Sequence, residues 1–423
     1  MAVPEVAPRG IAFTRELHQR IGLWGLFGVL MAYTLSTLDG GDIAPRVVSG
    51  VLLLLTAFYL AFPIRQSLTI SVPVICLLFM ACYGIAQTLW SAQTITYNGW
   101  GGVLFWLSAG AVAMIATQAF RDGRSAARFR RWFVVFGSAV CVLDLLEQAS
   151  HSNKYFWLIE SRYATVNGSF AYWNNFAQFV ELCLPVTLWL GVKNGKPAIG
   201  YLVLSGLQIG AVIACGSRAG SALVILEFIA VMILAHSRDR NKAFLFAAGS
   251  ALLVSILFAY AAGFDSLTHK LQQRDQLAVR RDINASSLAM IRERPLTGWG
   301  LGTYVPVYRM FARYDDGTYV NRAHNDWLEW TAEGGILFSA AMLVLFLWTI
   351  RPAIRSGWGI GVIAICLHAL VDYPFARLGV CGWYFALVGI LAVDRGGHRE
   401  QREEIGTGSA ARGVRRRSAA SAR

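Results

Sequence analysis

The chain has 423 residues, of which 56% are hydrophobic and only 15% are charged, and its mean hydropathy is +0.48. Soluble domains average about 45–50% apolar and about 25% charged residues, so this composition excludes a mainly soluble chain and favours one embedded in lipid. The formal net charge is +13. Because the basic residues fall between apolar runs, the charge indicates membrane orientation and not nucleic-acid binding.

A transmembrane helix needs about 20 predominantly apolar residues, and the runs of this kind in the chain predict twelve spans. They cover residues 21–37, 47–63, 70–89, 100–119, 132–149, 169–192, 198–215, 221–236, 243–262, 335–350, 358–373 and 378–393. The polar residues 1–20 are expected to be a cytoplasmic N-terminal segment, followed by an uncleaved first span. The predicted fold is therefore an all-α polytopic membrane protein, with its transmembrane domain over residues 21–393.

Loop charge gives the orientation of these spans. With the N-terminus in the cytoplasm, alternation places 24 Lys and Arg residues inside and only five in the short outside loops. This is the bias that the positive-inside rule describes, and it predicts that both termini are cytoplasmic. The long loop 263–334 falls outside although it carries nine Lys and Arg residues. Long loops escape the rule, so these arginines need another purpose.

Three features bear on cofactors and metals. The seven cysteines lie in or beside apolar runs without a CxxC pair, which is typical of small buried hydrophobes and not of disulfides or zinc ligands. The glycine-rich stretch 298–302 lacks the GK[ST] of a nucleotide loop and is interpreted as a turn. Asp315 and Asp316 also favour a turn. We therefore expect no metal and no cofactor. The basic tail 394–423 is expected to be disordered and cytoplasmic.

The long outside loop contains two candidate functional segments. Residues 277–294 predict an amphipathic helix at the membrane interface, where Arg280 could clamp a phosphate or only extend toward lipid headgroups. Residues 318–335 contain His324, which suits proton transfer near neutral pH or could simply cap a helix. Glu329 and Glu333 share a helix face, and a solvated face is the favoured interpretation over a catalytic pair.

Other charges lie at or inside the predicted spans. Arg218 stands between two apolar runs, where an arginine is costly unless it is paired or functional. His368 and Asp372 are four residues apart and could hydrogen-bond each other, as a proton relay or, as we prefer, to hold helices together. A role in substrate binding is favoured for Arg218.

Five motifs together resemble the bacterial O-antigen ligase and O-antigen polymerase superfamily. They are GSFAYWNNFA at 168–177, GSRAG at 216–220, the stretch from Arg280 through MIRERPLTGWGLG, RAHNDWLEWTAEGG at 322–335, and HALVDYP at 368–374. Tyr172 departs from the pattern, because the family usually has the first Asn of an Asn-x-Asn pair there. The arginine motif has two adjacent candidates, and its alignment favours Arg280 while leaving Arg281 open.

The resemblance implies a GT-C-like helical membrane glycosyltransferase that is metal-independent and inverting. It implies a glycan donor linked to undecaprenyl diphosphate, presented at the periplasmic face of the bacterial inner membrane. The acceptor would be lipid A–core, as in lipopolysaccharide biosynthesis by an O-antigen ligase. His324 would be the catalytic base. The expected diphosphate- and substrate-binding residues are Arg218, Arg280, Arg281, Asn174, Asn325 and Asp326.

Two other functions stay open from the sequence. A polymerase of O-antigen or exopolysaccharide would use the same donor with a lipid-linked repeat unit as acceptor. A transporter or flippase of lipid-linked sugars would also suit a polytopic chain with intramembrane charges, but its key polar groups should lie near the membrane midplane and in related halves. Here the cationic cluster lies in a loop and no matching halves are seen, which favours the enzyme over the transporter. A non-catalytic partner in a polysaccharide assembly complex also stays open.

Overall fold

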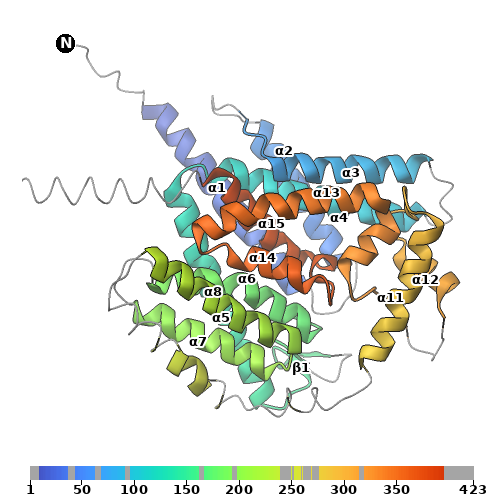
Figure 1. Cartoon of the computed structure of the whole chain (residues 1–423). Helices are drawn as coiled ribbons and strands as arrows, with labels where there is room; N and C mark the ends of the chain where they lie inside the picture. Colours follow the sequence, from blue (N-terminus) through green and yellow to red (C-terminus); the bar gives the residue numbers. More distant parts are fainter. Residues whose placement is uncertain are drawn as a thin grey trace, which may run out of the picture.

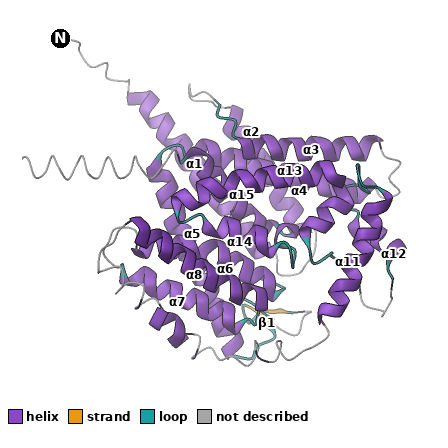
Figure 2. Ribbon diagram, in the orientation of Figure 1, coloured by secondary structure: helices purple, strands orange, loops and turns teal. Residues whose placement is uncertain are grey.

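A computed structural model of the chain describes residues 9–36, 43–61, 68–90, 96–161, 166–192, 198–238, 249, 252–258, 260, 268, 276–313 and 319–394. These residues form helices and one antiparallel strand pair, which lies at the edge of the helix layer and in which Lys154 pairs with Glu160 and Tyr155 with Ile159 (Figures 1 and 2). The elements are α1 Arg9–Leu35, α2 Ile43–Ala61, α3 Val72–Trp90, α4 Thr96–Ala119, α5 Gly123–Ala149, β1 Lys154–Tyr155, β2 Ile159–Glu160, α6 Trp173–Val192, α7 Ile199–Ala214, α8 Arg218–Arg238, α11 Gln276–Glu293, α12 Tyr304–Phe311, α13 Asp326–Ser356, α14 Ile360–His368, η2 Pro374–Ala376 and α15 Leu378–Val393.

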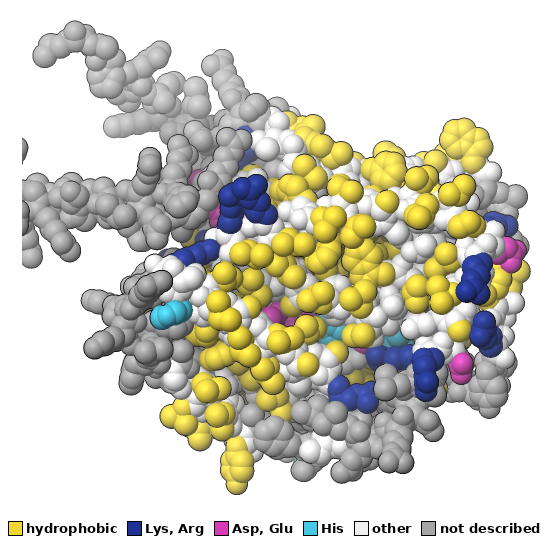
Figure 3. Space-filling view, in the orientation of Figure 1, with side chains coloured by type: hydrophobic (Ala, Val, Ile, Leu, Met, Phe, Trp, Pro, Cys, Tyr) yellow, Lys and Arg dark blue, Asp and Glu magenta, His cyan; other side chains and the backbone are white. Residues whose placement is uncertain are grey.

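Within these described ranges, seven helices are long and apolar enough to cross a membrane: α2 to α6, α8 and α13. Hydrophobic side chains cover the middle of the visible face, and Lys and Arg gather toward its two ends (Figure 3). The helices differ in their burial within the protein. Only 17% of the α2 window is buried, against 89% for α6, which packs against α5, α7, α8 and α14. The protein is therefore a multi-pass, mostly helical membrane protein in which α6 is the most buried of these seven helices.

The two ends of the helix layer differ in the helices and charged residues that lie there. The start of α1 lies at the end opposite α11 and α12 (Figure 1). The C-terminal end of α15 lies near the start of α5, because the Arg130 Nη1 atom is 4.0 Å from Asp394 Oδ2. The last turn of α8 lies beside the end of α13, where Arg238 donates to the Ile354 carbonyl (3.0 Å). One end of the molecule thus gathers helix termini and arginines, and α11 and α12 cover the other.

The described helices agree with most of the predicted spans and differ at two places. The amphipathic helix expected over residues 277–294 is present as α11. The span expected over 335–350 is part of the longer α13, which already begins at Asp326. The run 358–373 forms only the nine-residue α14, about 14 Å long, and is too short to cross a membrane alone. Most of 243–262 and of the tail 394–423, and parts of the loop 263–334, lie outside the described residues.

A kink divides α13 and explains the glycine-rich turn. Gly335 has φ 66°, and a Cβ atom there would lie 2.1 Å from the Leu296 carbonyl oxygen. The turn packs on this kink through backbone hydrogen bonds, from Trp299 N to the Ala332 carbonyl (2.9 Å) and from Gly300 N to the Glu333 carbonyl (2.8 Å). The glycines of 298–302 therefore allow one backbone to approach another. The interpretation as a turn is confirmed.

Candidate active site

A buried carboxylate, Asp372, is the centre of the candidate site. It lies in the loop after α14 and is 0% exposed. Its oxygens face the His324 Nδ1 atom at 3.3 Å, the Arg280 Nη2 atom at 3.6 Å and the Tyr172 hydroxyl at 3.4 Å. The Asn174 carboxamide also donates to it. Three residues predicted from separate motifs, namely Asn174, Arg280 and His324, therefore converge on one acid.

The backbone around His324 is tied to the Asp372 loop. Asp326 N donates to the Ala369 carbonyl (2.9 Å), and the Asp326 carboxylate accepts from Phe375 N (2.9 Å). Asn325 is the N-cap of α13, and its side-chain oxygen accepts from Leu328 N (3.1 Å). The side chains of Asn325 and Asp326 thus hold the loops together at the start of α13. Their predicted role in binding substrate stays a prediction.

His324 has a left-handed backbone conformation and a partly exposed imidazole. Its φ of 50° lies in the left-handed region, which is uncommon for residues other than glycine and concentrates at functional sites. Its side chain is 23% exposed, and the Tyr373 ring lies edge-on at 4.9 Å. Nδ1 faces Asp372, whereas Nε2 has no hydrogen-bond partner among the described residues. The imidazole can therefore receive a proton at Nε2.

The charge of Asp372 is stabilised despite its burial. Burial alone would raise the pKa of this carboxyl, but the hydrogen bond and charge of His324 and the charge of Arg280 bring its pKa below the usual value. The acid is therefore ionised at neutral pH. Burial, together with this negative charge, raises the pKa of the Tyr172 phenol well above its usual value, so Tyr172 remains a neutral donor.

The structure distinguishes the two adjacent arginines of α11. Arg280 is 25% exposed and donates from Nη1 to the Val371 carbonyl (2.5 Å), in addition to its ion pair with Asp372. Arg281 is exposed on α11, and none of the contacts with Asp372 comes from it. Arg280 is therefore the arginine that lies in the site.

The motif that contains Arg218 reaches the same cluster through Ser217. The Ser217 hydroxyl donates to the Asn174 side-chain oxygen (2.7 Å) and accepts from Gly220 N (3.1 Å). Arg218 follows directly as the first residue of α8. The start of α8 therefore lies beside the start of α6, where Asn174 contacts Asp372.

Two expectations about acidic residues are wrong. Glu329 and Glu333 do not form a solvated face, because they are only 4% and 7% exposed. Glu329 pairs with the Arg322 Nη1 atom at 2.7 Å, and Glu333 accepts from Tyr304 N at 2.8 Å. Their partners come from the loop, so these carboxylates anchor the loop to α13.

The second concerns His368 and Asp372, whose side chains do not pair with each other. The Nδ1 atom of His368 faces Glu181 of α6 at 2.8 Å, and Asp372 faces His324. The two residues share only a backbone hydrogen bond, from Asp372 N to the His368 carbonyl (3.0 Å). His368 therefore joins α14 to α6, as the preferred helix-holding role implies.

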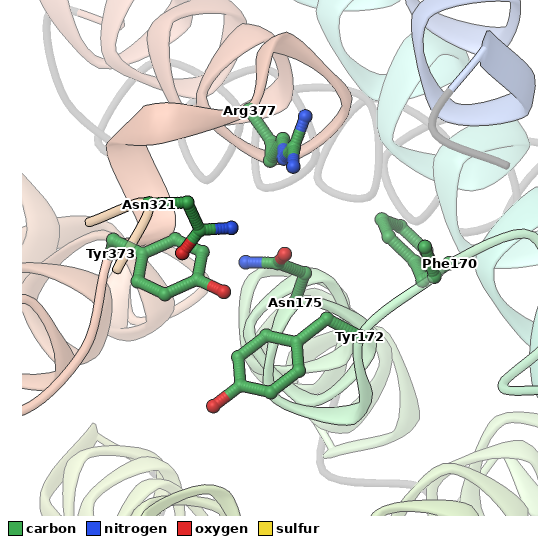
Figure 4. A pocket seen from close by; sticks show the side chains of 7 residues that line it. Phe170, Tyr172, Asn175, Asn321, Tyr373 and Arg377 are labelled. Atoms are coloured by element: carbon green, nitrogen blue, oxygen red, sulfur yellow. The ribbon is translucent and has the colours of Figure 1, made fainter. Parts of the chain in front are cut away.

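Sequence reasoning gave too little weight to two tyrosines and to a cavity beside them. The Tyr172 and Tyr373 rings stack at 5.5 Å with an interplanar angle of 7°. They line a cavity of about 60 Å³ that also includes Phe170, Ala171, Asn175, Asn321 and Arg377 (Figure 4). The signals that could have identified it were the tyrosine at the motif position usually held by Asn, and the Asp-Tyr-Pro of HALVDYP.

Comparison with known proteins adds one finding. Residues 202–340 match the protein family described as O-antigen ligase. The matched segment contains Arg218, Arg280, Arg281 and His324, whereas Asn174 and Asp372 lie outside it. No curated protein matches the chain. Among the described residues, no group of three His, Cys, Asp or Glu side chains is arranged to hold a metal ion.

Proposed function

We propose that this chain, whose residues 202–340 match the O-antigen ligase family, is a member of the O-antigen ligase and polymerase superfamily and transfers a glycan from undecaprenyl diphosphate to a saccharide acceptor. The reaction would take place at the periplasmic face of the bacterial inner membrane. The observation that carries the proposal is the pairing of His324 Nδ1 with the buried carboxylate of Asp372 at 3.3 Å, beside Arg280.

This pairing suits His324 as a general base. The hydrogen bond made by one imidazole nitrogen fixes which nitrogen carries the proton, so Asp372 directs the lone pair to Nε2. The acceptor hydroxyl oxygen attacks the anomeric carbon and transfers its proton to Nε2. The imidazolium that forms is then stabilised by the adjacent carboxylate, as in other His–Asp pairs.

The leaving group requires cations. As the new bond to the anomeric carbon forms, the bond from that carbon to the phosphate oxygen breaks, and its electron pair goes to the diphosphate. Arginine holds phosphate oxygens in a bidentate fork, so Arg280 and Arg218 are the proposed diphosphate ligands, with Arg281 as a further candidate. Displacement from the opposite face inverts the anomeric configuration, and the arginines supply positive charge without a metal.

The arrangement of the helices supports this location. The site lies where α6, α8 and α13 begin, and the arginine-rich helix termini gather at the other end. Applying the positive-inside rule to that arginine-rich end makes it cytoplasmic and the site end periplasmic. A site at the ends of the helices also favours an enzyme over a transporter, whose polar groups should lie near the midplane.

We propose ligation to lipid A–core as the specific reaction, and polymerisation of lipid-linked repeat units as the alternative. Deleting the gene and examining the glycans on a gel separates them. A ligase defect leaves lipid A–core without polymer while lipid-linked polymer accumulates. A polymerase defect leaves single repeat units on the core. Loss of a secreted polysaccharide with intact lipopolysaccharide would instead indicate exopolysaccharide polymerisation.

The test of the mechanism is His324→Ala expressed in the deletion strain. The variant should insert and accumulate like the wild-type protein but fail to restore glycan transfer. His236→Ala, which removes an exposed histidine in the last turn of α8, is the matched control and should restore it. If His324→Ala restores the wild-type glycan pattern, His324 is not the base.

A further inference from the structure

The cavity beside the two stacked tyrosines is built from three segments that meet at the site. Phe170 and Tyr172 come from the loop before α6 and Asn175 from its first turn, Asn321 comes from the loop before α13, and Tyr373 and Arg377 come from the segment between α14 and α15. Tyr172 and Tyr373 also contact the catalytic cluster, through Asp372 and His324 respectively. The two rings therefore form a wall shared by the cavity and the catalytic cluster.

The polar groups of the cavity converge on its interior. Figure 4 shows the carboxamides of Asn175 and Asn321 pointing toward one another, with the Tyr373 hydroxyl directed at them and Arg377 on the opposite side. Asn175 is 4% exposed, and its amide nitrogen donates to the Gln178 side chain at 2.8 Å. That bond fixes the orientation of the carboxamide. A carboxamide both donates and accepts hydrogen bonds, so the two side chains can bind a hydroxyl group as an acceptor or as a donor.

The chemistry of this lining selects among ligands. An acyl chain offers no hydrogen-bonding group to the two carboxamides and the guanidinium of the lining, and covering polar groups with an apolar chain is costly. A diphosphate would need several cations, and Arg377 is the one cation that lines the cavity in the described part of the chain. Hydroxyl groups on a ring with apolar C–H faces match the amides and the aromatic walls together. The lining therefore fits a saccharide unit.

The size of the cavity fits a single unit. One water molecule needs roughly 10–15 Å³ of cavity volume measured in the same way, so the cavity of about 60 Å³ has room for a few water molecules. A single sugar ring can take their place, and an oligosaccharide cannot. Longer glycans would extend out of it toward solvent.

We propose that this cavity is the subsite for the terminal sugar of the acceptor, an assignment that rests on the proposed glycan transfer. Asn321 lies three residues before His324, and Tyr373 packs edge-on against the His324 ring at 4.9 Å. A sugar held between the carboxamides is thus next to the proposed base, which must receive a proton from the acceptor hydroxyl. The proposed diphosphate ligands, Arg280 and Arg218, do not line the cavity.

The experiment measures transfer by the purified full-length protein, with donor and acceptor varied separately. The donor is the lipid-linked glycan, and the acceptor is lipid A–core isolated from cells that lack the polymer. Asn321→Ala should raise the KM for acceptor by between about threefold and tenfold, because one hydrogen-bonding side chain is lost. The donor KM should stay within about twofold of the wild-type value. Asn321→Trp, which fills the cavity, should raise the acceptor KM further.

Asn153→Ala is the matched control, because Asn153 is exposed beside β1 and does not line the cavity. It should leave both KM values unchanged. Delipidated core oligosaccharide should inhibit the wild-type protein by competing with acceptor, and should inhibit Asn321→Trp more weakly.

Two outcomes would overturn the assignment. An unchanged acceptor KM in both Asn321 variants means that the cavity does not hold the acceptor, and a rise in donor KM alone assigns the cavity to the donor sugar. Both are distinguishable from failure of the proposed function, in which the wild-type protein itself shows no transfer from the lipid-linked glycan to the acceptor.

Discussion

Replacing Asp372 with asparagine tests whether the carboxylate orients and charges His324. The asparagine keeps the shape of the side chain and removes its negative charge. At the observed 3.3 Å between the Asp372 and His324 atoms, a pair of unit charges in an effective dielectric of about 20 interacts by about 5 kcal/mol. Because the amide retains part of the hydrogen bonding, we expect kcat to fall by about 10²–10³-fold, corresponding to roughly 3–4 kcal/mol.

The assay is glycan transfer by the purified protein, with kcat and both KM values measured. Asp282→Asn is the matched control, because Asp282 is an exposed carboxylate on α11, two residues from Arg280. It should leave kcat unchanged. A kcat for Asp372→Asn within about threefold of the wild-type value, in protein that accumulates normally, would refute the role of the carboxylate.

The same substitution has a second consequence for stability in acid. The pKa of Asp372 is lowered in the folded protein, so its stabilising contribution is present above the unfolded-state value of about 3.9. The contribution is lost as the pH falls through the lower, folded-state pKa. The Tm of the wild-type protein should therefore fall more steeply than that of Asp372→Asn between about pH 4 and about pH 2. Parallel decreases in Tm would contradict the lowered pKa.

Two further predictions concern the kink in α13 and the arginines of α11. Gly335→Ala should lower the Tm and the amount of inserted protein, because φ 66° costs an alanine about 1–3 kcal/mol and its Cβ would clash with Leu296. The control is Gly28→Ala on α1, where a Cβ meets open space and the Tm should not fall. A Tm for Gly335→Ala equal to that of the wild-type protein would contradict the reasoning. Arg280→Lys should reduce kcat/KM for donor more than Arg281→Lys does, because only Arg280 contacts Asp372. The reverse ranking would identify Arg281 as the phosphate ligand.

The sequence was sufficient for the helical class and for much of the candidate site. Long apolar runs predicted the membrane helices because the bilayer sets their length, and α2 to α8 lie where these runs fall. His324, Arg280 and Asn174 were identified from separate motifs, and the structure brings all three to Asp372. Their motifs are local in sequence, so each could be recognised without knowing its partner.

The residues that were misjudged depend on partners distant in sequence. Glu329 and Glu333 have the four-residue spacing of a solvated helix face, and they are buried only because Arg322 and the Tyr304 backbone approach from the loop. Asp372 was placed inside an expected span, since hydropathy measures the length of an apolar run and not where its helix ends. The helix ends at His368, which leaves Asp372 in a loop where three other segments reach it.

The described arginines of the loop 263–334 lead to a revised account of its charge. The sequence suggested that they gather around a diphosphate, but the structure distributes them among several tasks. Arg322 neutralises Glu329 at 2.7 Å, Arg294 lies 3.9 Å from the centre of the Trp299 ring, and Arg309 lies 5.4 Å from that of Tyr319. These contacts hold the loop on α13 and within itself. Because the loop carries His324 near its end, we propose that these three contacts help to keep the imidazole at Asp372 and that Arg280 is the arginine left to bind phosphate.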